Sequence, residues 1–184
     1  MTEADFPLLS LIITIPLLGA LLAGSIRNVD VAKQIAFFTA LITFVLTACA
    51  TLLFDADKSG FQLVERYDWI PLLKIEYLVG VDGISVLFLP MTGLLTIITM
   101  LASWSAISHS SRFHFSLLLA LESVSIGVFC ALDTVLFFLF WELTLPPFFF
   151  LIGLWGIGSQ RRSAAMKYTL FMLAGGVTLL LAII

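Results

Sequence analysis

Two glutamates lie within long apolar stretches of the chain, and they are the side chains whose placement is most suggestive of chemistry. Glu122 interrupts the apolar run 113–132, and Glu142 interrupts the run 134–158. An ionisable side chain at the centre of a bilayer costs roughly 2.5–3.5 kcal/mol on insertion scales, so such residues are expected to have a use. A carboxyl held away from water favours its neutral form and can take up and release a proton. Both residues are therefore candidates for proton transfer.

A pair of prolines follows Glu142 by about one helical turn. Pro146 and Pro147 lack the N–H groups that the carbonyls of Glu142 and Leu143 would bond in a regular helix, so we expect the helix to kink or loosen there. Free backbone carbonyls beside a buried carboxyl attract water. This arrangement suits a proton relay centred on Glu142.

Each glutamate also has a structural interpretation. Glu142 could be a protonated acid that is hydrogen-bonded to a neighbouring helix, as membrane carboxyls often are. Glu122 could form a structural polar pair with Ser123 and Ser125, which follow it on the same segment.

The expected depths of the two glutamates follow from a tight turn at Asp133. Glu122 lies eleven residues before this turn and Glu142 nine after it. At a rise of about 1.5 Å per residue, the two side chains lie at similar depths, about 14–16 Å from the turn. Asp82 and Asp133 themselves precede apolar segments and are expected to be structural residues that cap helix N-termini.

The composition requires a membrane. Hydrophobic residues make up 61% of the 184 residues and charged residues 11%, whereas soluble chains carry about 25% charged residues. The net charge of −3 argues against a nucleic-acid partner. Cys49 and Cys130 lie in apolar runs without a Cys-x-x-Cys spacing, so we expect no disulfide framework and no metal site.

Six apolar segments have the length of a bilayer crossing, which takes about 20 residues of helix. They predict an all-α, polytopic transmembrane helical bundle that forms a single membrane domain over 1–184, with five full spans and a shorter sixth at the C-terminus. The first span lacks a basic leader and is expected to remain in the mature chain. The expected spans are 6–26, 34–54, 84–104, 113–132, 134–156 and 167–184.

The distribution of basic residues predicts the orientation. The connections on one side carry three basic residues, Lys58, Arg66 and Lys74. Those on the other side carry six: Arg27, Lys33, Arg112, Arg161, Arg162 and Lys167. Because basic residues favour the cytoplasm, we expect the N-terminus and the long loop 55–82 to lie outside. Short strands are expected in this loop near 61–65 and 73–77.

Several motifs of this sequence occur together in a known family. They are Gly80-Val81-Asp82-Gly83-Ile84-Ser85, Trp141-Glu142, Leu145-Pro146, Leu151-Ile152-Gly153-Leu154-Trp155-Gly156 and Lys167-Tyr168. With these motifs the chain resembles, over essentially its whole length, the subunit M family of bacterial NADH:quinone oxidoreductase, respiratory complex I. The D-type components of multi-subunit sodium/proton antiporters are related and share part of this pattern.

The resemblance implies roles for particular residues. Glu142 matches the family's essential membrane glutamate, which is thought to pair with a lysine on a later broken helix. Family members are much longer, so the chain resembles their amino-terminal part, and that lysine falls outside it. Lys167 aligns with a basic residue at the start of the family's sixth helix. Glu122 is present in some relatives and is a possible relay.

The resemblance also implies a setting for the chain. It would be a multi-pass protein of the cell inner (cytoplasmic) membrane, surrounded by lipid and by other membrane subunits of complex I. NADH, FMN, iron–sulfur clusters and quinone would belong to the assembled complex. We expect this chain to bind no cofactor, to have no redox site of its own and not to bind quinone directly.

The sequence thus predicts an antiporter-like subunit of an enzyme, a proton-translocating NADH:quinone oxidoreductase in the respiratory electron transport chain. In this prediction Glu142 gains or loses a proton as neighbouring charges shift. Two alternatives remain open at this point. The chain could be a D-type component of a multi-subunit sodium/proton antiporter, or a helical membrane scaffold that transports nothing.

Overall fold

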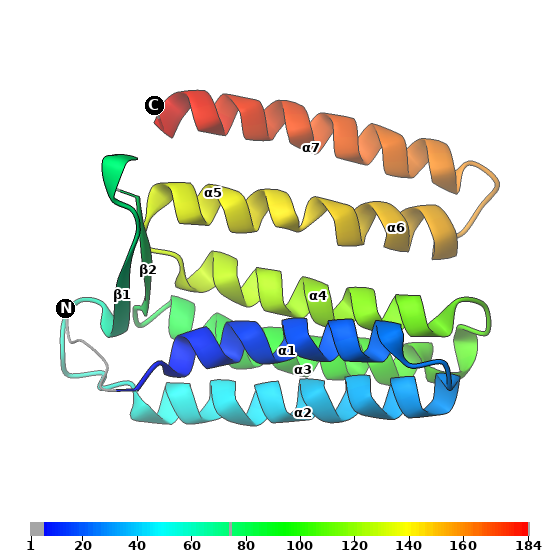
Figure 1. Ribbon diagram of the computed structural model, residues 1–184, viewed down its shortest axis with the longest axis horizontal. Coiled ribbons are helices and arrows are strands. Elements are labelled where there is room, and N and C mark those ends of the chain that lie inside the picture. Colours follow the sequence, from blue (N-terminus) through cyan, green and yellow to red (C-terminus); the bar gives the residue numbers. More distant parts are fainter. Residues whose placement is uncertain (1–5, 74, 184) are drawn as a thin grey trace.

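The computed structural model describes residues 6–73 and 75–183, which form a bundle of roughly parallel and antiparallel helices with a small β-hairpin at one end (Figure 1). The helices are α1 (Leu8–Ser25), α2 (Val29–Leu53), α3 (Ser85–Ala106), α4 (Ser111–Cys130), α5 (Thr134–Leu143), α6 (Leu145–Trp155) and α7 (Arg161–Ile183). The strands are β1 (Gln62–Ile70) and β2 (Ile75–Val81), joined by a short 3₁₀ helix, Pro71–Leu73.

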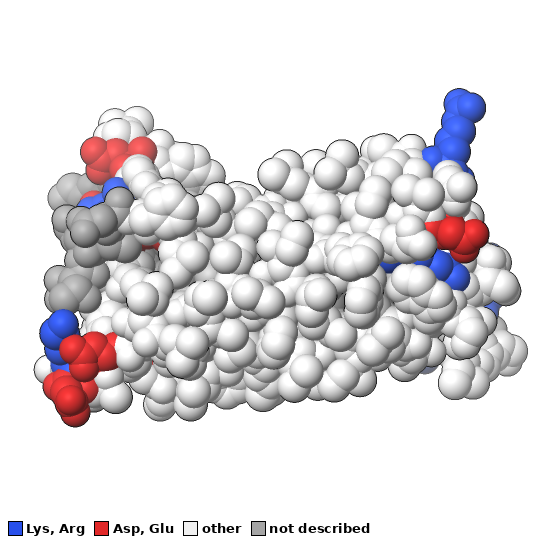
Figure 2. All heavy atoms as spheres, turned by 90° about the horizontal axis from the view of Figure 1, so that it is seen from below, with Lys and Arg blue, Asp and Glu red and all other residues white. Residues whose placement is uncertain are grey.

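Six helical stretches are long and apolar enough to cross a membrane, with α5 and α6 together forming one of them from Thr134 to Trp155. Charged side chains gather at the two ends of the long axis, and the face shown in Figure 2 has an uncharged belt between them. A lipid bilayer requires this division, because its apolar interior admits few charges. The predicted all-α, polytopic membrane fold is confirmed.

The helix boundaries differ from the apolar runs where a cap or a charged turn extends the helix. α2 begins at Val29 because the side chain of Asn28 accepts hydrogen bonds from the N–H groups of Asp30 and Val31. α7 begins at Arg161, six residues before the apolar run that predicted it. A charged first turn can lie in the headgroup region, where hydropathy gives no signal for it.

The hairpin forms in the loop where strands were expected, but both strands start later and end later than predicted, and Leu73 of the expected second strand belongs to the 3₁₀ helix. The strands pair antiparallel, with Tyr67 opposite Tyr77 and Asp68 opposite Glu76. Arg66 lies diagonally across and forms an ion pair with Glu76 at 3.0 Å. Lys74, in the expected second strand, lies outside the described residues.

The bundle has two apolar cores, one toward each end. The core near the hairpin joins α1, α3, α4 and α5 to the buried end of β2. Its largest fully buried members are Leu9, Ile12, Val79, Val81, Leu89 and Ile126. The core at the other end is built largely from small residues of α1 and α2 packed against α3 and α4. It contains Ala20, Ala23, Ala36, Ala40, Met100, Phe115 and Leu119.

Small and hydroxyl-bearing residues bring the first three helices into close contact. A Cβ on Gly19 of α1 would lie 2.5 Å from the Thr39 methyl group of α2, so glycine is needed for this approach. Pro90 in α3 removes the regular partner of the Val86 carbonyl. The Thr51 hydroxyl of α2 lies 3.2 Å from that carbonyl and shares its hydrogen between it and the Thr47 carbonyl at 3.0 Å.

Helix α7 lies along one side of the bundle and packs on α6 and α5 (Figure 1). Only 6% of its membrane span is buried within the described chain. Beyond the basic residues of its first two turns, its exposed surface is largely apolar and suits contact with lipid or with other protein.

Candidate functional site

Glu122 lies on the buried face of α4, and its side chain is 1% exposed. Within the described part of the chain, neither of its carboxylate oxygens has a hydrogen-bond partner. The residue lines a groove of about 320 Å³ between α3 and α4. Four hydroxyl-bearing residues line the same groove: Thr92, Thr96 and Thr99 of α3 and Ser125 of α4.

The serine pair that could have satisfied Glu122 is engaged differently. The Ser123 hydroxyl donates to the Ile13 carbonyl of α1 at 2.6 Å, and Ser116 donates to the Ala20 carbonyl in the same way. These two bonds tie α4 to α1. Ser125 lines the groove beside Glu122, whose oxygens stay unbonded within the described chain. The structural interpretation through Ser123 is therefore wrong.

Glu142 lies one residue before the end of α5, where the fifth span is broken. The chain passes through Thr144, whose hydroxyl donates to the Trp141 carbonyl at 2.7 Å, and α6 then begins at Leu145. Pro146 and Pro147 fall in the first turn of α6, where an N–H has no helical partner and its absence costs nothing. The span is thus divided into two helices at the position where the prolines act.

The Glu142 side chain points from this break toward α7. A Cβ on Gly176 would lie 2.8 Å from its carboxyl carbon Cδ and would overlap Oε1. Oε1 is buried without a hydrogen-bond partner among the described residues, and so is the Thr169 hydroxyl of α7. Both residues line a groove of about 400 Å³ between α6 and α7. Gly176 thus provides the space that the carboxylate occupies.

The two carboxylates face different grooves, Glu122 toward α3 and Glu142 toward α7. A cavity of about 240 Å³ lies between the helices that carry them, and Ser125, Thr144 and Tyr168 contribute its polar lining. Ser125 lines both this cavity and the groove of Glu122. The cavity thus provides polar positions between α4 and the helices α5, α6 and α7, and neither acid lines it.

The two aspartates expected at helix starts lie there. Asp133 accepts hydrogen bonds from the N–H groups of Val135 and Leu136, both at 2.9 Å. Asp82 accepts from Ser85 N–H at 2.7 Å, and the Ser85 hydroxyl accepts from Asp82 N–H. The pKa of Asp82 is lowered, chiefly because the Ser85 backbone N–H stabilises the charged form.

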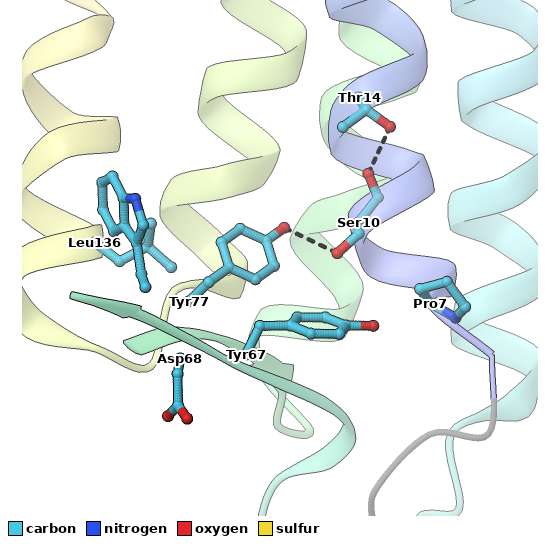
Figure 3. A pocket seen from close by; sticks show the side chains of 8 residues that line it. Pro7, Ser10, Thr14, Tyr67, Asp68, Tyr77 and Leu136 are labelled. Carbon is cyan, nitrogen blue, oxygen red and sulfur yellow. Dashed lines mark hydrogen bonds between the residues drawn. The ribbon is translucent and has the colours of Figure 1, made fainter. Parts of the chain in front are cut away.

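Glu65 has a role that sequence reasoning missed. This buried residue of β1 caps α1, accepting from the N–H groups of Leu9 at 2.6 Å and Ser10 at 3.1 Å, and from the Ser10 hydroxyl. The Tyr77 and Ser10 hydroxyls are 3.0 Å apart (Figure 3). Burial raises the pKa of Tyr77. No signal in the sequence marks a cap supplied from 56 residues away.

Basic residues hold helix ends on the side opposite the hairpin. Lys33 Nζ donates to the Trp104 carbonyl at 2.7 Å and lies 5.8 and 5.6 Å from the ring centres of Trp104 and Phe115. Arg112 donates to the Ile26 carbonyl at 2.9 Å. Cations at helix C-termini are favourable because the last carbonyls carry partial negative charge. Lys167 is exposed on α7.

Among the described residues, no group of three or more His, Cys, Asp and Glu is placed to hold a metal ion. Cys49 is exposed and Cys130 is buried, and both are free thiols.

Comparisons with known proteins agree with this architecture. The family described as NADH:quinone oxidoreductase/Mrp antiporter, transmembrane, matches residues 131–184. NAD(P)H-quinone oxidoreductase chain 4 of Prochlorococcus marinus is 36% identical over 98% of this chain, which corresponds to 34% of the relative. NADH-quinone oxidoreductase subunit M of Rickettsia typhi is 35% identical over 98% of this chain and 38% of its own length.

The fold is shared with a solved archaeal respiratory membrane complex, the membrane-bound sulfane sulfur reductase. The TM-score is 0.76 at 24% identity, covering 95% of this chain and 27% of the other. Fold and comparisons together define a polytopic, antiporter-like membrane subunit. By sequence the chain belongs to the subunit M/chain 4 family of the quinone oxidoreductases. It spans about a third of the length of the curated relatives that it matches.

Proposed function

We propose that this chain is part of a proton-translocating membrane subunit of an NADH:quinone oxidoreductase, and that Glu142 is its principal proton-carrying residue. The observation that carries the proposal is the position of the Glu142 carboxylate. It lies at the break of a membrane span, with one oxygen buried and lacking a hydrogen-bond partner in the described chain. Ionisable side chains inside membrane spans commonly belong to proton relays, and this position suits Glu142 to such a role.

Glu122 is proposed as a second proton-carrying group. Its oxygens also lack partners within the described residues, and it faces a groove lined with hydroxyls. The cavity lined by Ser125, Thr144 and Tyr168 lies between the helices that carry the two acids and is large enough for water. Protons could pass between the carboxylates through water in this cavity, without direct contact between the acids.

The redox chemistry is proposed to belong to other subunits of the assembly. Electrons would pass from NADH through FMN and iron–sulfur clusters to quinone on those subunits, and this chain would bind neither cofactor nor quinone. Its contribution would be to move protons as the assembly changes charge. We propose the cell inner membrane as the location, with the N-terminus and the hairpin outside, because six of the nine Lys and Arg lie at the opposite end.

The names of the curated relatives favour this assignment over a sodium/proton antiporter or a scaffold that transports nothing. The test uses the complete subunit in its assembled complex, reconstituted in liposomes. Glu142→Gln should abolish or strongly reduce proton uptake per NADH oxidised. Glu76→Gln, a matched change in the exposed hairpin, should leave it unchanged.

Normal proton uptake with Glu142→Gln would overturn the proposal and favour the scaffold. Transport that requires sodium, with no coupling to NADH oxidation, would favour the antiporter.

A further inference from the structure

The groove between α3 and α4 contains a regular series of hydroxyls. Thr92, Thr96 and Thr99 follow one another at spacings of four and three residues, so they share one face of α3 and line the groove together. Ser103 lies one turn beyond Thr99, and its hydroxyl donates to the Thr99 carbonyl at 2.6 Å. Ser103 is not among the residues that line the groove, so the lining hydroxyls of α3 end at Thr99.

The hydroxyls are oriented as acceptors toward the groove. Thr92 donates to the Phe88 carbonyl at 2.7 Å, Thr96 to the Thr92 carbonyl at 3.0 Å and Thr99 to the Leu95 carbonyl at 2.7 Å. Each donor is thus used within α3, while the oxygen lone pairs remain free. A row of acceptors on a cavity wall is a good surface for water molecules, which bring their own donors.

Glu122 of α4 lines the same groove as this row. Because α3 and α4 are antiparallel and joined by a short turn, Glu122 is about level with Thr96. Its side chain is 1% exposed, and both oxygens lack partners among the described residues. Of the described residues that line the groove, Glu122 alone is ionisable. The volume of about 320 Å³ exceeds the roughly 30 Å³ that one water molecule occupies in the liquid, so the groove has room for several.

The two ends of the groove differ. Toward the hairpin, the rings of Phe88 and Phe129 stack with centres 4.9 Å apart, one turn beyond Thr92 and Ser125. Both rings line the groove and form an apolar end. Toward the other end, the lining hydroxyls continue to Thr99, about two helical turns before the 107–110 connection. The polar end of the groove is therefore the end nearer this connection, and we expect water to reach Glu122 from that end.

We propose that the α3–α4 groove is a water-filled access path that exchanges protons between Glu122 and the membrane face at the 107–110 connection. Each transfer forms an O–H bond to the next oxygen and breaks one to the previous oxygen, so no oxidant or reductant is needed. The path's part in transport rests on the proposed function, but its water content does not.

Cysteine labelling in the complete subunit, assembled in its complex, tests the path without turnover. Thr96→Cys and Thr99→Cys are placed in a Cys49→Ser background and treated with a charged methanethiosulfonate from each side of the membrane. Ile98→Cys is the control, because Ile98 is 52% exposed on the same helix but does not line the groove. Thiolates form only where water is present, so we expect the groove positions to react faster than the control by on the order of tenfold.

The expected labelling comes from the side of the 107–110 connection, with Thr99→Cys faster than Thr96→Cys. Equal rates at Thr96→Cys and Ile98→Cys would overturn the proposal, because lipid or a neighbouring protein would then fill the groove. Labelling only from the hairpin side would also overturn it.

A second measurement follows the Glu122 proton itself. Infrared spectroscopy in D₂O measures the exchange rate of the Glu122 carboxyl, whose band is assigned by its loss in Glu122→Gln. Thr96→Val should slow exchange by about fivefold, the factor for one hydrogen bond of ordinary net strength.

Thr43→Val is the matched control for this exchange measurement. Thr43 is buried in α2, makes the same bond to a carbonyl four residues earlier and does not line the groove. Equal exchange rates in the two valine variants would contradict the proposal. Normal proton translocation by Glu122→Gln alongside positive labelling would instead reject only the transport role of Glu122 and leave the water path intact.

Discussion

Gly176 offers a sharp test of how Glu142 is positioned. Gly175 and Gly176 are neighbours in α7, yet they face different surroundings. A Cβ on Gly176 would overlap the Glu142 carboxylate, whereas a Cβ on Gly175 would meet no atom within 4 Å. Gly176→Ala therefore displaces the carboxylate, and Gly175→Ala leaves it in place.

The magnitude follows from two opposing contributions. Replacing glycine by alanine inside a helix stabilises it by roughly 0.5–1 kcal/mol, and this gain applies to both variants. Turning the Glu142 side chain away from its preferred rotamer costs about 0.5–1.5 kcal/mol, and only Gly176→Ala incurs it. We therefore expect Gly175→Ala to raise stability slightly and Gly176→Ala to change it little. A cost of this size in the proton step would slow it by about 2- to 10-fold.

Two assays measure the effect in the complete subunit and its assembled complex. Proton uptake per NADH oxidised, measured in liposomes with a pH-sensitive dye, should fall for Gly176→Ala alone. The infrared carboxyl band of Glu142, assigned with Glu142→Gln, should shift for the same variant and stay unchanged for Gly175→Ala. Identical bands and identical uptake in the two alanine variants would refute the inferred contact between Glu142 and α7.

Three further predictions concern the polar contacts that hold the helix ends. Glu65→Gln weakens the buried cap of α1 and should destabilise this helix by about 1–3 kcal/mol, measured by hydrogen exchange at its first amides. The control Glu76→Gln, which removes the ion pair on the hairpin, should reduce stability by under about 1 kcal/mol. The pKa of Asp82 is lower in the folded protein than its value of 3.8 in the unfolded chain. The stability that its cap contributes is therefore fully present above pH 3.8 and is lost as the pH falls through the lower, folded pKa. Asp82→Asn should remove this acid sensitivity from exchange at the start of α3. Lys33→Met should destabilise the assembled protein by about 1–2 kcal/mol in thermal unfolding, because the hydrogen bond to Trp104 and the contacts of the charge with two rings are lost. The control Lys167→Met, at an exposed position, should change the stability by under about 0.5 kcal/mol.

Each of these predictions has a contrary result. Equal exchange rates in the Glu65 and Glu76 variants would mean that the cap contributes no more than an exposed ion pair. Acid sensitivity that persists in Asp82→Asn would have to come from another carboxylate. Equal melting temperatures of the two lysine variants would show that the Lys33 contacts are weak.

Much of the candidate site could be predicted from the sequence because it consists of single residues whose type is unusual in a membrane span. A carboxylate in an apolar run is conspicuous in any position of the run, so Glu122 and Glu142 were found without a fold. Pro146 and Pro147 predicted a disturbed helix because proline lacks the N–H that the preceding turn requires, and the structure divides the span there. The membrane spans followed from length and composition alone.

The groove that each carboxylate faces could not be read in this way. The spans are apolar around most of their circumference, so hydropathy carries little information about the rotation of a helix about its axis. The contacts of Gly176 with Glu142 and the row formed by Thr92, Thr96 and Thr99 depend on that rotation. The spacing of the threonines could be read in the sequence, but only the tertiary structure shows that this face of α3 lies beside α4.

The sequence by itself thus determined that the chain has six segments long and apolar enough to cross a membrane and that two acids lie within them, because lipid imposes these requirements on composition and on single residues. Only the tertiary structure decided that Glu122 faces a row of hydroxyls, that Glu142 lies against a glycine of α7 and that Glu65 caps a helix 56 residues away. These contacts join residues distant in the chain, and close packing between helices, rather than local preference, selects them.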